Sequence, residues 1–542
     1  MFGHLPVRRI FYGVALTSVV GIALAEQFFP GARWAYVPVL PLIALGIMDI
    51  RQTRHAVKRN FPIIGHLRYL LEMIRPEINQ YFVESDIDGR PFDRQKRSNI
   101  YQRAKRDLNT HPFGTQKNVY QTGYAWINHS IHPVSATQVS SRVTVGGPHC
   151  HHPYLASLFN VSAMSYGALS KNAVLALNTG AKAGGFAHNT GEGGLSPYHL
   201  EPGGDLIWQI GTGYFSCRKP DGTFNPETFA ENAQRPQVKM IELKLSQGAK
   251  PGHGGILPKQ KITPEIAAIR HVPMGKDVLS PPAHSAFNTP VGLIQFISQL
   301  RELSGGKPVG FKLCVGNKHE FIAIAKAMID TGITPDFITV DGGEGGTGAA
   351  PLEFSDSVGM PLEDGLVFVH QTLVGFGLRD HIKVIASGKI TTGFDIVEKL
   401  ALGADLCNSA RGMMFALGCI QALQCHANTC PTGIATQNPD LVKGLDIEHK
   451  WRRVQNFHAA TIHNLIEIVG AAGLYHPCDI HPGLIQRRIS HTQVISFADL
   501  HPGIPTGCLR EETTVPPSWQ ATWHQADANT FYPAAPKAVA AV

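Results

Sequence analysis

The stretch "DFITVDGGEGGTGAAP" (336–351) joins a short run of apolar, β-prone residues to a turn with five glycines in seven positions. Runs of the same kind recur along the chain as "MIELKL" (240–245), "VGFKLCV" (309–315), "KVIAS" (383–387) and "ADLCNS" (404–409). Helical patterns fill two of the gaps, "NKHEFIAIAKAMIDTG" (317–332) and "GFDIVEKLALG" (393–403). This alternation of strand and helix predicts a parallel sheet.

The repeated units favour a closed (β/α)8 barrel of the TIM type over residues 150–440, because glycine and polar residues follow directly after each strand. In such a barrel, function lies at the carboxyl ends of the strands. A doubly wound open sheet is the alternative. It is disfavoured because no G-x-G-x-x-G follows the first strand.

The composition is that of a globular, loop-rich protein. Of 542 residues, 43% are hydrophobic and 16% are charged. The net charge of +7 is spread out and forms no basic stripe with interleaved aromatic residues, so we expect no nucleic-acid partner. The nine cysteines, an odd number, argue against a disulfide-stapled secreted protein.

The N-terminus carries two apolar runs, about 10–29 and 34–50, each near the length of a membrane-spanning helix. Basic residues flank the pair on both outer sides, and Arg33 in the tight turn is the exception. By the positive-inside rule, both ends then stay in the cytoplasm. We therefore predict a transmembrane helical hairpin at 1–60 and a cytoplasmic catalytic domain; a buried hairpin of a soluble protein is the alternative.

The rest of the chain divides into segments of different composition. Residues 61–149 are polar and irregular, and we expect them to form a connecting region packed on the barrel. Within them "DGRPFDRQKRSNIYQRAKRDL" (88–108) predicts an exposed helix and loop with solvated charges. Residues 441–542 are expected to form a C-terminal helical extension.

The glycine-rich turn is a candidate phosphate site, since successive backbone N–H groups can cradle an anion. The next strand ends in "IASGKI" (385–390), with Ser387, Gly388 and Lys389 at its end. In barrels, the late strands commonly form such a site. Together the two loops favour a phosphorylated cofactor of mononucleotide size, because no ribose-binding acid of the dinucleotide type is evident.

Polar residues of two other loops suit an anionic substrate. "MIELKLSQGAKPGHGG" places Lys244, Gln247 and Lys250 at and beyond a strand end, and two cations match a dicarboxylate. The alternative for each lysine is a solvated surface charge. Glu192, in "HNTGEGG", is either an acid or polar anchor for this substrate or part of an ordinary turn.

Lys312 is the most informative lysine, because it lies inside the apolar strand "GFKLCV". A buried charge is costly unless it is paired or faces a ligand. We predict that Lys312 lies at the barrel mouth against an electron-rich ring.

The loop "GCIQALQCHANTCPTGIATQ" (418–437) gathers Cys419, Cys425 and Cys430 in a C-x5-C-x4-C pattern. Zinc sites usually have tighter pairs and a fourth ligand, and His426 is adjacent to Cys425 and would be strained in that role. Three thiolates on an irregular loop are more typical of an iron–sulfur cluster. Three small core residues remain the alternative.

The chain resembles the FMN-binding synthase domain of the glutamate synthase family, in a stand-alone, membrane-anchored form. The matching stretches occur in the family's order over residues 150–440. They are "SAMSYGALS" (162–170), "HNTGEGG", "IELKLSQGAKPGHGG", "LSPPAHS" (279–285), "DGGEGGTGAAP" and "ALGCIQALQCHANTCPTGIATQ".

This resemblance implies two cofactors, FMN and a [3Fe-4S] cluster held by Cys419, Cys425 and Cys430. It also implies the residues around the flavin. These are Met164 and Ser165 along the ring, Lys312 near its pyrimidine end, and Gly345, Gly346, Thr347, Ser387 and Gly388 around the phosphate.

The implied reaction condenses ammonia with 2-oxoglutarate, and a hydride from reduced FMN then gives L-glutamate. The resemblance assigns Glu192, Gln247, Lys250 and Arg270 to 2-oxoglutarate. No glutaminase or nicotinamide-binding domain is recognisable, so we expect free or glutamine-derived ammonia from elsewhere. Electrons are expected from a partner such as ferredoxin or a reductase subunit.

The sequence also departs from the family pattern. His253 stands where that pattern has a glutamate, and "SPPAHSAF" differs from its usual form. Two alternatives therefore stay open. One is a flavin and iron–sulfur enzyme acting on another amine or 2-oxo acid, and the other is a membrane-anchored electron-transfer subunit.

Overall fold

The computed structural model describes residues 7–107, 110 and 113–534. Leu108 and the ends of the expected anchor and C-terminal extension, 1–6 and 535–542, lie outside the described residues. The chain forms two compact units, 1–95 and 96–542.

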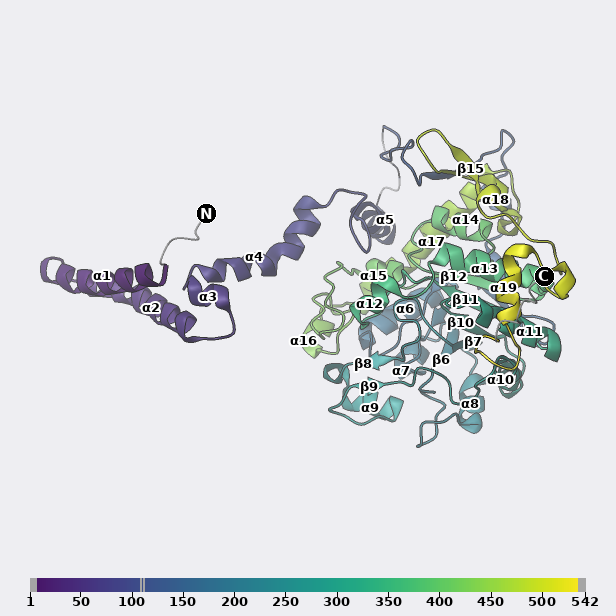
Figure 1. Cartoon of the computed structure of the whole chain (residues 1–542), viewed down its shortest axis with the longest axis horizontal. Helices are drawn as coiled ribbons and strands as arrows, with labels where there is room; N and C mark the ends of the chain where they lie inside the picture. Colours follow the sequence, from purple (N-terminus) through teal and green to yellow (C-terminus); the bar gives the residue numbers. More distant parts are fainter. Residues whose placement is uncertain (1–6, 108–109, 111–112, 535–542) are drawn as a thin grey trace, which may run out of the picture. The chain divides into compact units, whose positions relative to one another are not determined.

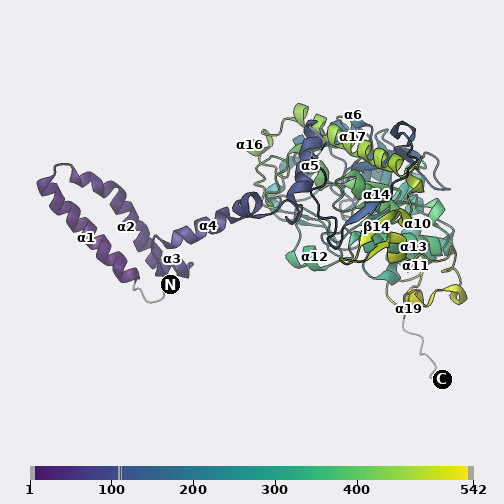
Figure 2. The ribbon, with the colours of Figure 1, turned by 90° about the horizontal axis from the view of Figure 1, so that it is seen from above.

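The N-terminal unit is helical (Figures 1 and 2). Its elements are α1 (Val7–Phe28), η1 (Ala32–Ala35), α2 (Tyr36–Arg51), α3 (Ala56–Asn60), α4 (Gly65–Ile78) and η2 (Asn79–Val83).

Both expected apolar helices are present in this unit. Val7–Phe28 and Ala32–Arg51 are long and apolar enough to cross a bilayer. Only 6% of the most apolar stretch of the first and 11% of that of the second is buried. The hairpin therefore lacks the burial that the core helices of a soluble protein have.

The second unit contains a closed barrel of eight parallel strands, which confirms the predicted fold and makes the open-sheet alternative wrong. The strands are β4 (Phe159–Val161), β5 (His188–Asn189), β6 (Leu206–Ile210), β7 (Val238–Lys244), β10 (Val309–Leu313), β11 (Phe337–Asp341), β12 (Lys383–Ser387) and β13 (Leu406–Ser409). The barrel closes where β13 pairs with β4, for example Cys407 with Phe159.

Helices lie outside the strands, as Figure 1 shows. They are α6 (Lys171–Gly184), α7 (Pro197–Leu200), α8 (Pro226–Ala233), α10 (Pro290–Leu303), α11 (Lys318–Thr331), α12 (Leu352–Ser357), α13 (Leu362–Gly375), α14 (Gly393–Ala401), α15 (Arg411–Leu417) and α16 (Pro439–Val442). Two of them, α11 and α14, coincide with the helical patterns predicted from the sequence.

The amino-terminal end of the barrel is closed by apolar packing. A hairpin of β2 (Arg142–Val145) and β3 (Tyr154–Ser157) covers it, and Val145 and Ala156 pack there against Met240, Phe337 and Leu406. Because this end is filled by a dry core, a ligand can enter the barrel only at the carboxyl ends of the strands.

The middle of the barrel holds a buried carboxylate, Glu242. It accepts hydrogen bonds from Asn189 (2.8 Å), Gln209 (2.6 Å) and Thr339 (2.6 Å), which come from three other strands. Since each donor is satisfied, this polar layer ties β5, β6, β7 and β11 together at a defined register.

The long connection after β7 contains a small hairpin, β8 (Ile256–Leu257) and β9 (Val278–Leu279), and the short helix α9 (Pro264–Arg270). Thr263 caps α9 by accepting from the N–H of Ile266. His271, in the left-handed conformation, ends it. These two signals place Arg270 in the last turn of α9.

The charged helix expected within 88–108 is α5 (Arg94–Lys105), but it is not simply solvated. Arg97, Ile100 and Ala104 are buried, and the Tyr101 hydroxyl donates to the carbonyl of Cys419. The expectation of a solvated face is therefore wrong for this side of the helix, which packs on the cysteine loop.

The C-terminal part combines helices and strands. Its elements are α17 (Ile447–Ala471), η6 (Pro477–Asp479), η7 (Pro482–Leu484), β14 (Ile485–Arg488), β15 (Val494–Ser496), α18 (Phe497–Leu500), η8 (Glu512–Thr514) and α19 (Pro517–Gln525). β14 and β15 form an antiparallel sheet with β1 (Ala125–Ile127). Three further 3-10 turns lie within the second unit: η3 (Ala136–Gln138), η4 (Lys259–Lys261) and η5 (Arg379–His381).

Candidate active site

Lys312 and Asp341 form a buried ion pair at the barrel mouth. The Lys312 Nζ lies 3.2 Å from Oδ2 of Asp341, and the same Oδ2 accepts the N–H of Gly248 at 2.9 Å. Burial opposes the charged form of Lys312, but the carboxylates of Asp341 and Glu242 raise its pKa. Lys312 is thus a protonated cation paired with Asp341. A partner or ligand was expected for it, because an unpaired buried charge is costly.

Asp341 is a residue that the sequence interpretation missed. It is the last residue of β11, directly before the glycine-rich turn. The signal was present in "FITVD", since an acid ending an apolar strand at the functional edge of a barrel is a candidate partner for a cation from the neighbouring strand.

Glu192 is the centre of the expected substrate group. Its Oε1 lies 2.9 Å from Nζ of Lys244, and Lys244 also donates to the side-chain oxygen of Gln247. Burial raises the pKa of Glu192, but the charges of Lys244, Lys250 and Arg270 outweigh it and the pKa is lowered. The carboxylate is therefore ionised among three cations.

Lys250 and Arg270 are both buried and both carry lowered pKa values. Burial lowers the pKa of Lys250 to about 8, against the attraction of Glu192. Burial likewise lowers the pKa of Arg270 to about 10. Two buried cations facing one carboxylate leave positive charge for an anionic ligand.

Arg270 joins the expected substrate and flavin residues. Its Nη2 donates to the carbonyl of Tyr166 at 2.7 Å and to Oγ of Ser165 at 3.3 Å. Its guanidinium lies 5.2 Å from the centre of the Phe215 ring. A side chain at Gly193 would come within 2.5 Å of this guanidinium, so glycine is needed there. The structure thus joins the two groups through one arginine, which hydrogen-bonds Ser165 and whose charge acts on Glu192.

Met164 lies beside Ser165 on the loop after β4. Its side chain is buried, and its N–H donates to the carbonyl of Asn189 at 3.4 Å. A side chain at Gly191 would meet the backbone of Met164 and Ser165 at about 3 Å, the closest atom being Ser165 N at 2.8 Å. The loops after β4 and β5 therefore pack backbone to backbone.

The expected phosphate residues gather at the ends of β11 and β12. The N–H of Gly342 donates to the carbonyl of Ser387 at 2.9 Å, and the N–H of Gly345 donates to Gly342 at 2.8 Å. The Ser387 hydroxyl lies 3.2 Å from that of Ser162. Gly388 follows with φ 156°. Gly346 and Thr347 are exposed on the same turn.

Arg411, the first residue of α15, supplies a cation here that the sequence interpretation missed. Its guanidinium donates to the carbonyl of Glu344 at 3.0 Å. A side chain at Gly346 would stand 2.9 Å from it, so the glycine leaves room beside the guanidinium. A glycine cradle with a partly buried arginine fits a phosphate dianion.

The three thiols of the cysteine loop lie close enough to influence one another. Burial, together with the charges of Cys425 and Cys430, raises the pKa of Cys419 to about 12. For Cys430, hydrogen bonds from Thr432 and nearby backbone N–H groups outweigh burial and lower the pKa. Cys419 and Cys425 are partly buried and Cys430 is buried.

The donor set of the loop is three thiols without a fourth protein ligand. The described residues hold no group of three or more His, Cys, Asp or Glu arranged around one metal ion. No disulfide joins any two cysteines in the described part of the chain. Cys419, Cys425 and Cys430 are among the residues that are not so arranged, and the iron–sulfur cluster stays a prediction from their number and chemistry.

Lys261 links the cysteine loop to the loop after β4. Its buried Nζ donates to the carbonyls of Ala168 (3.1 Å) and Ala435 (2.9 Å). Burial lowers the pKa of Lys261 to about 8, while Cys425 and Cys430 act to raise it. Nothing in the local sequence indicates this role, because Lys261 belongs to the polar run "PKQK" (258–261).

Further hydrogen bonds hold the same two loops together. The Ser170 hydroxyl donates to Gly433 at 2.7 Å, and the Gln437 amide donates to Leu169 at 2.7 Å. The cysteine loop therefore lies directly against the segment that carries Met164 and Ser165.

Two histidines of the connection after β7, His253 and His284, differ in their surroundings. His284 is buried between the carbonyl of Lys244 (Nε2, 2.8 Å) and the hydroxyl of Tyr214 (Nδ1, 3.0 Å), and burial lowers its pKa to about 4. His253 instead lies with its ring 5.6 Å from that of Phe354. His284 is therefore a neutral support for Lys244.

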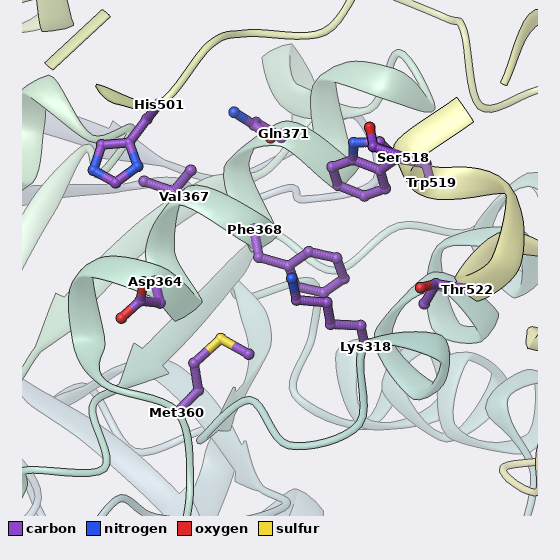
Figure 3. Close-up of a pocket in the computed structure, with 10 residues that line it drawn as sticks. All are labelled: Lys318, Met360, Asp364, Val367, Phe368, Gln371, His501, Ser518, Trp519 and Thr522. Carbon is purple, nitrogen blue, oxygen red and sulfur yellow. The ribbon is translucent and has the colours of Figure 1, made fainter. Parts of the chain in front are cut away.

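A separate hollow of about 490 Å³ lies between α11, α13 and α19 (Figure 3). Phe368 and Trp519 stack in its wall at 5.4 Å, and Lys318 lies over Phe368. Its lining residues include none of the predicted substrate, cofactor or thiol residues. This hollow is distinct from the barrel mouth.

Comparison with known proteins gives a clear result. Residues 129–475 match the family described as "Conserved region in glutamate synthase". The chain is 40% identical over 504 residues to the Bacillus subtilis "Glutamate synthase large subunit-like protein YerD", covering 86% of this chain and 96% of that protein.

Other relatives match over a shorter range. The "Archaeal glutamate synthase [NADPH]" of Methanocaldococcus jannaschii is 41% identical over 316 residues, which is 58% of each chain. Among solved structures, mandelate oxidase with benzoyl-formic acid aligns at a TM-score of 0.40 with 16% identity, over 65% of this chain and 83% of that one.

Proposed function

The chain belongs to the glutamate synthase family, a family of oxidoreductases, and from this premise we propose that it reductively aminates 2-oxoglutarate to L-glutamate with FMN and an iron–sulfur cluster. The observation that carries the proposal is the arrangement of Glu192 among Lys244, Lys250 and Arg270, with Arg270 contacting Ser165.

The charges of this group match the proposed substrate. Lys250 and Arg270 are buried cations, and 2-oxoglutarate has two carboxylates to meet them. Gln247, held by Lys244, adds an amide that can bind a carboxylate or carbonyl oxygen. Such fixed contacts orient the carbon that is to be reduced.

Glu192 suits the nitrogen side of the reaction. Condensation of ammonia with the 2-oxo group gives an imine, which is a better hydride acceptor when its nitrogen carries a proton and a positive charge. An ionised carboxylate stabilises that charge. Overall, 2-oxoglutarate, ammonium, two electrons and two protons give L-glutamate and water.

The residues around the mouth fit FMN. Gly345, Gly346, Thr347, Ser387 and Gly388 would surround its phosphate, and the guanidinium of Arg411 would neutralise part of the charge. Met164 and Ser165 would line the ring, and the protonated Lys312 would lie at its pyrimidine end, where electron density increases on reduction.

Cys419, Cys425 and Cys430 fit a [3Fe-4S] cluster by the chemistry and number of their donors. Bound FMN supplies a hydride, and a bound cluster supplies single electrons. The protein's part is to hold the two groups at a fixed separation, which Lys261, Ser170 and Gln437 do by joining their loops.

For localisation we propose a two-helix membrane anchor with the catalytic unit in the cytoplasm. Two helices of sufficient length and apolarity support it. The electron donor would be a ferredoxin-like protein, a reductase subunit or a membrane carrier. Ammonia would arrive free or from glutamine hydrolysed elsewhere.

A second candidate is reduction of another imine by the same machinery. His253 favours it, because it stands where the family pattern has a glutamate and its ring packs on Phe354. An acid replaced by an imidazole near the substrate loop changes which amine can be held.

An anaerobic assay with chemically reduced viologen tests the proposal and separates the two candidates. The detergent-solubilised protein is supplied with a panel of 2-oxo acids and amines, and each amino acid product is quantified. Glutamate from 2-oxoglutarate and ammonium supports the main proposal. A different preferred pair supports the second candidate. If no pair of 2-oxo acid and amine is turned over, both candidates are rejected.

A further inference from the structure

Helix α4 presents an uncovered apolar stripe. Leu67, Leu70, Leu71, Ile74 and Ile78 recur at helical spacing, so their side chains share one face. Each is between 37% and 55% exposed. Phe82 in the following turn continues the run at 84% exposed. A stripe of this size on a soluble surface would favour aggregation unless a partner covers it.

The other side of α4 already has a partner. Tyr69 packs on α3 and on His55, the residue before α3. The His55 and Tyr69 ring centres lie 5.0 Å apart, and the Nζ of Lys58 lies 4.8 Å from the Tyr69 ring centre. A side chain at Gly65 would come within 2.9 Å of the Lys58 backbone, so α3 and α4 pack closely. The apolar stripe therefore points away from α3.

The start of α4 is fixed to the end of α2, and the preceding α3 is fixed to the start of α1. Asp49, near the end of α2, accepts the N–H of Ile63 at 2.9 Å and pairs with Nε2 of His66 at 2.8 Å. Arg8, at the start of α1, donates to the carbonyl of Arg59 at 2.8 Å. If the hairpin spans a bilayer, α4 must begin at its surface.

The direction and charge of this region suit that surface. Figure 2 shows α4 running crosswise to the α1–α2 hairpin. Between positions 51 and 75 the sequence has six Arg or Lys residues and one acid, Glu72. Arg68 and Arg75 are on α4 itself. Long basic side chains beside an apolar stripe can reach anionic headgroups while the stripe enters the acyl boundary.

We infer that α4 is an interfacial helix that lies in the plane of a bilayer with anionic lipids, its apolar stripe buried among the acyl chains. This inference rests on the proposed membrane anchor. It adds a second membrane contact to the hairpin.

Spin labels on the full-length protein in phosphatidylcholine–phosphatidylglycerol vesicles test this inference. Labels replace Leu71 (L71C, the stripe), Glu72 (E72C, the polar side) and Leu16 (L16C, in α1). The background carries Cys478→Ser, because Cys478 is exposed. The readout is the collision rate of each label with oxygen, which partitions into lipid, and with a water-soluble nickel complex.

We expect labels 16 and 71 to collide mainly with oxygen and label 72 with nickel. If label 16 is in lipid while label 71 collides with nickel as label 72 does, α4 is not at the interface although the anchor stands. If label 71 is shielded from both probes, protein covers the stripe and the lipid assignment is wrong. If label 16 is in water, the anchor fails and the inference fails with it.

Pure phosphatidylcholine vesicles test the role of charge independently of folding. We expect label 71 to become shallower there, with a several-fold rise in nickel collisions, while label 16 is unchanged. Equal depth of label 71 in both lipid mixtures would contradict the assignment to an anionic surface.

Discussion

The Nζ of Lys312 lies 3.2 Å from Oδ2 of Asp341, and both side chains are buried where β10 and β11 end. This pair places a protonated cation inside the mouth of a barrel whose opposite end is closed by apolar packing. An arrangement of this kind is costly for stability and is retained at sites that use the charge.

We expect Lys312→Met to destabilise the protein by about 3–5 kcal/mol, because it leaves Asp341 buried and unpaired. The double variant Lys312→Met/Asp341→Asn should recover most of that loss. Thermal unfolding of the two variants against wild type, with the exposed Lys318→Met as control, measures it. A double variant as unstable as the single one would mean that the two groups are not coupled.

Lys250→Ala should lower kcat/KM for 2-oxoglutarate about 100-fold, since a buried charged hydrogen bond to a carboxylate is lost. Flavin content should be unchanged, because Lys250 is not among the phosphate or ring residues. Lys259→Ala is the matched control: it lies on the same connection and is exposed. Normal turnover in Lys250→Ala would remove this lysine from the substrate site.

The same lysine predicts a pH dependence. Burial lowers the pKa of Lys250 to about 8, so the free enzyme loses this cation as the pH rises through 8. kcat/KM for a dicarboxylate should therefore fall above pH 8, since it reports ionisations of the free enzyme. Lys250→Arg should move the fall to higher pH. A profile that is flat to pH 9.5 would show that binding does not use this charge.

Cys425→Ser should remove iron from the purified protein while leaving its thermal unfolding and flavin content close to wild type. The reason is that a hydroxyl is a poor substitute for a thiolate as a ligand of iron. Cys478→Ser, an exposed cysteine outside the loop, is the control. If both variants kept equal iron and acid-labile sulfide, the three thiols would be ordinary core residues.

Removal of residues 1–95 should give a soluble protein that still binds FMN, because the chain forms separate compact units up to and after position 95. Expression of residues 96–542 and the absorbance of the purified fragment measure this. If the fragment is insoluble or colourless while the full-length protein is coloured in detergent, the N-terminal unit is needed for folding.

Part of the barrel could be predicted from the sequence because its strands have clear ends. β7 and β10–β13 are apolar runs stopped by glycine or polar residues, and all five were anticipated. The strand β5 was not, since it is only His188–Asn189, inside a loop motif. Two residues contain no periodicity, and neighbouring strands rather than local sequence define such a strand.

In the candidate site too, some residues could be found from the sequence and others only from the fold. Lys312 was found because a charge in an apolar run is conspicuous. The acid Asp341 was visible at the end of "FITVD". Its pairing with Lys312 and the place of Arg411 depend on which strand ends are neighbours in space, which sequence spacing does not encode. Lys261 was missed for the opposite reason: it has the sequence of a surface lysine, and only the fold buries it between the carbonyls of Ala168 and Ala435.

A single-turnover experiment tests the central claim most directly. The full-length enzyme is reduced anaerobically and mixed with 2-oxoglutarate and ammonium, and the flavin absorbance near 450 nm and the L-glutamate formed are followed together. The account predicts that the oxidised flavin spectrum returns only when both substrates are present, with one glutamate for every two electrons. Protein without a flavin spectrum, or reduced flavin that returns no electrons to any 2-oxo acid and amine, would contradict it.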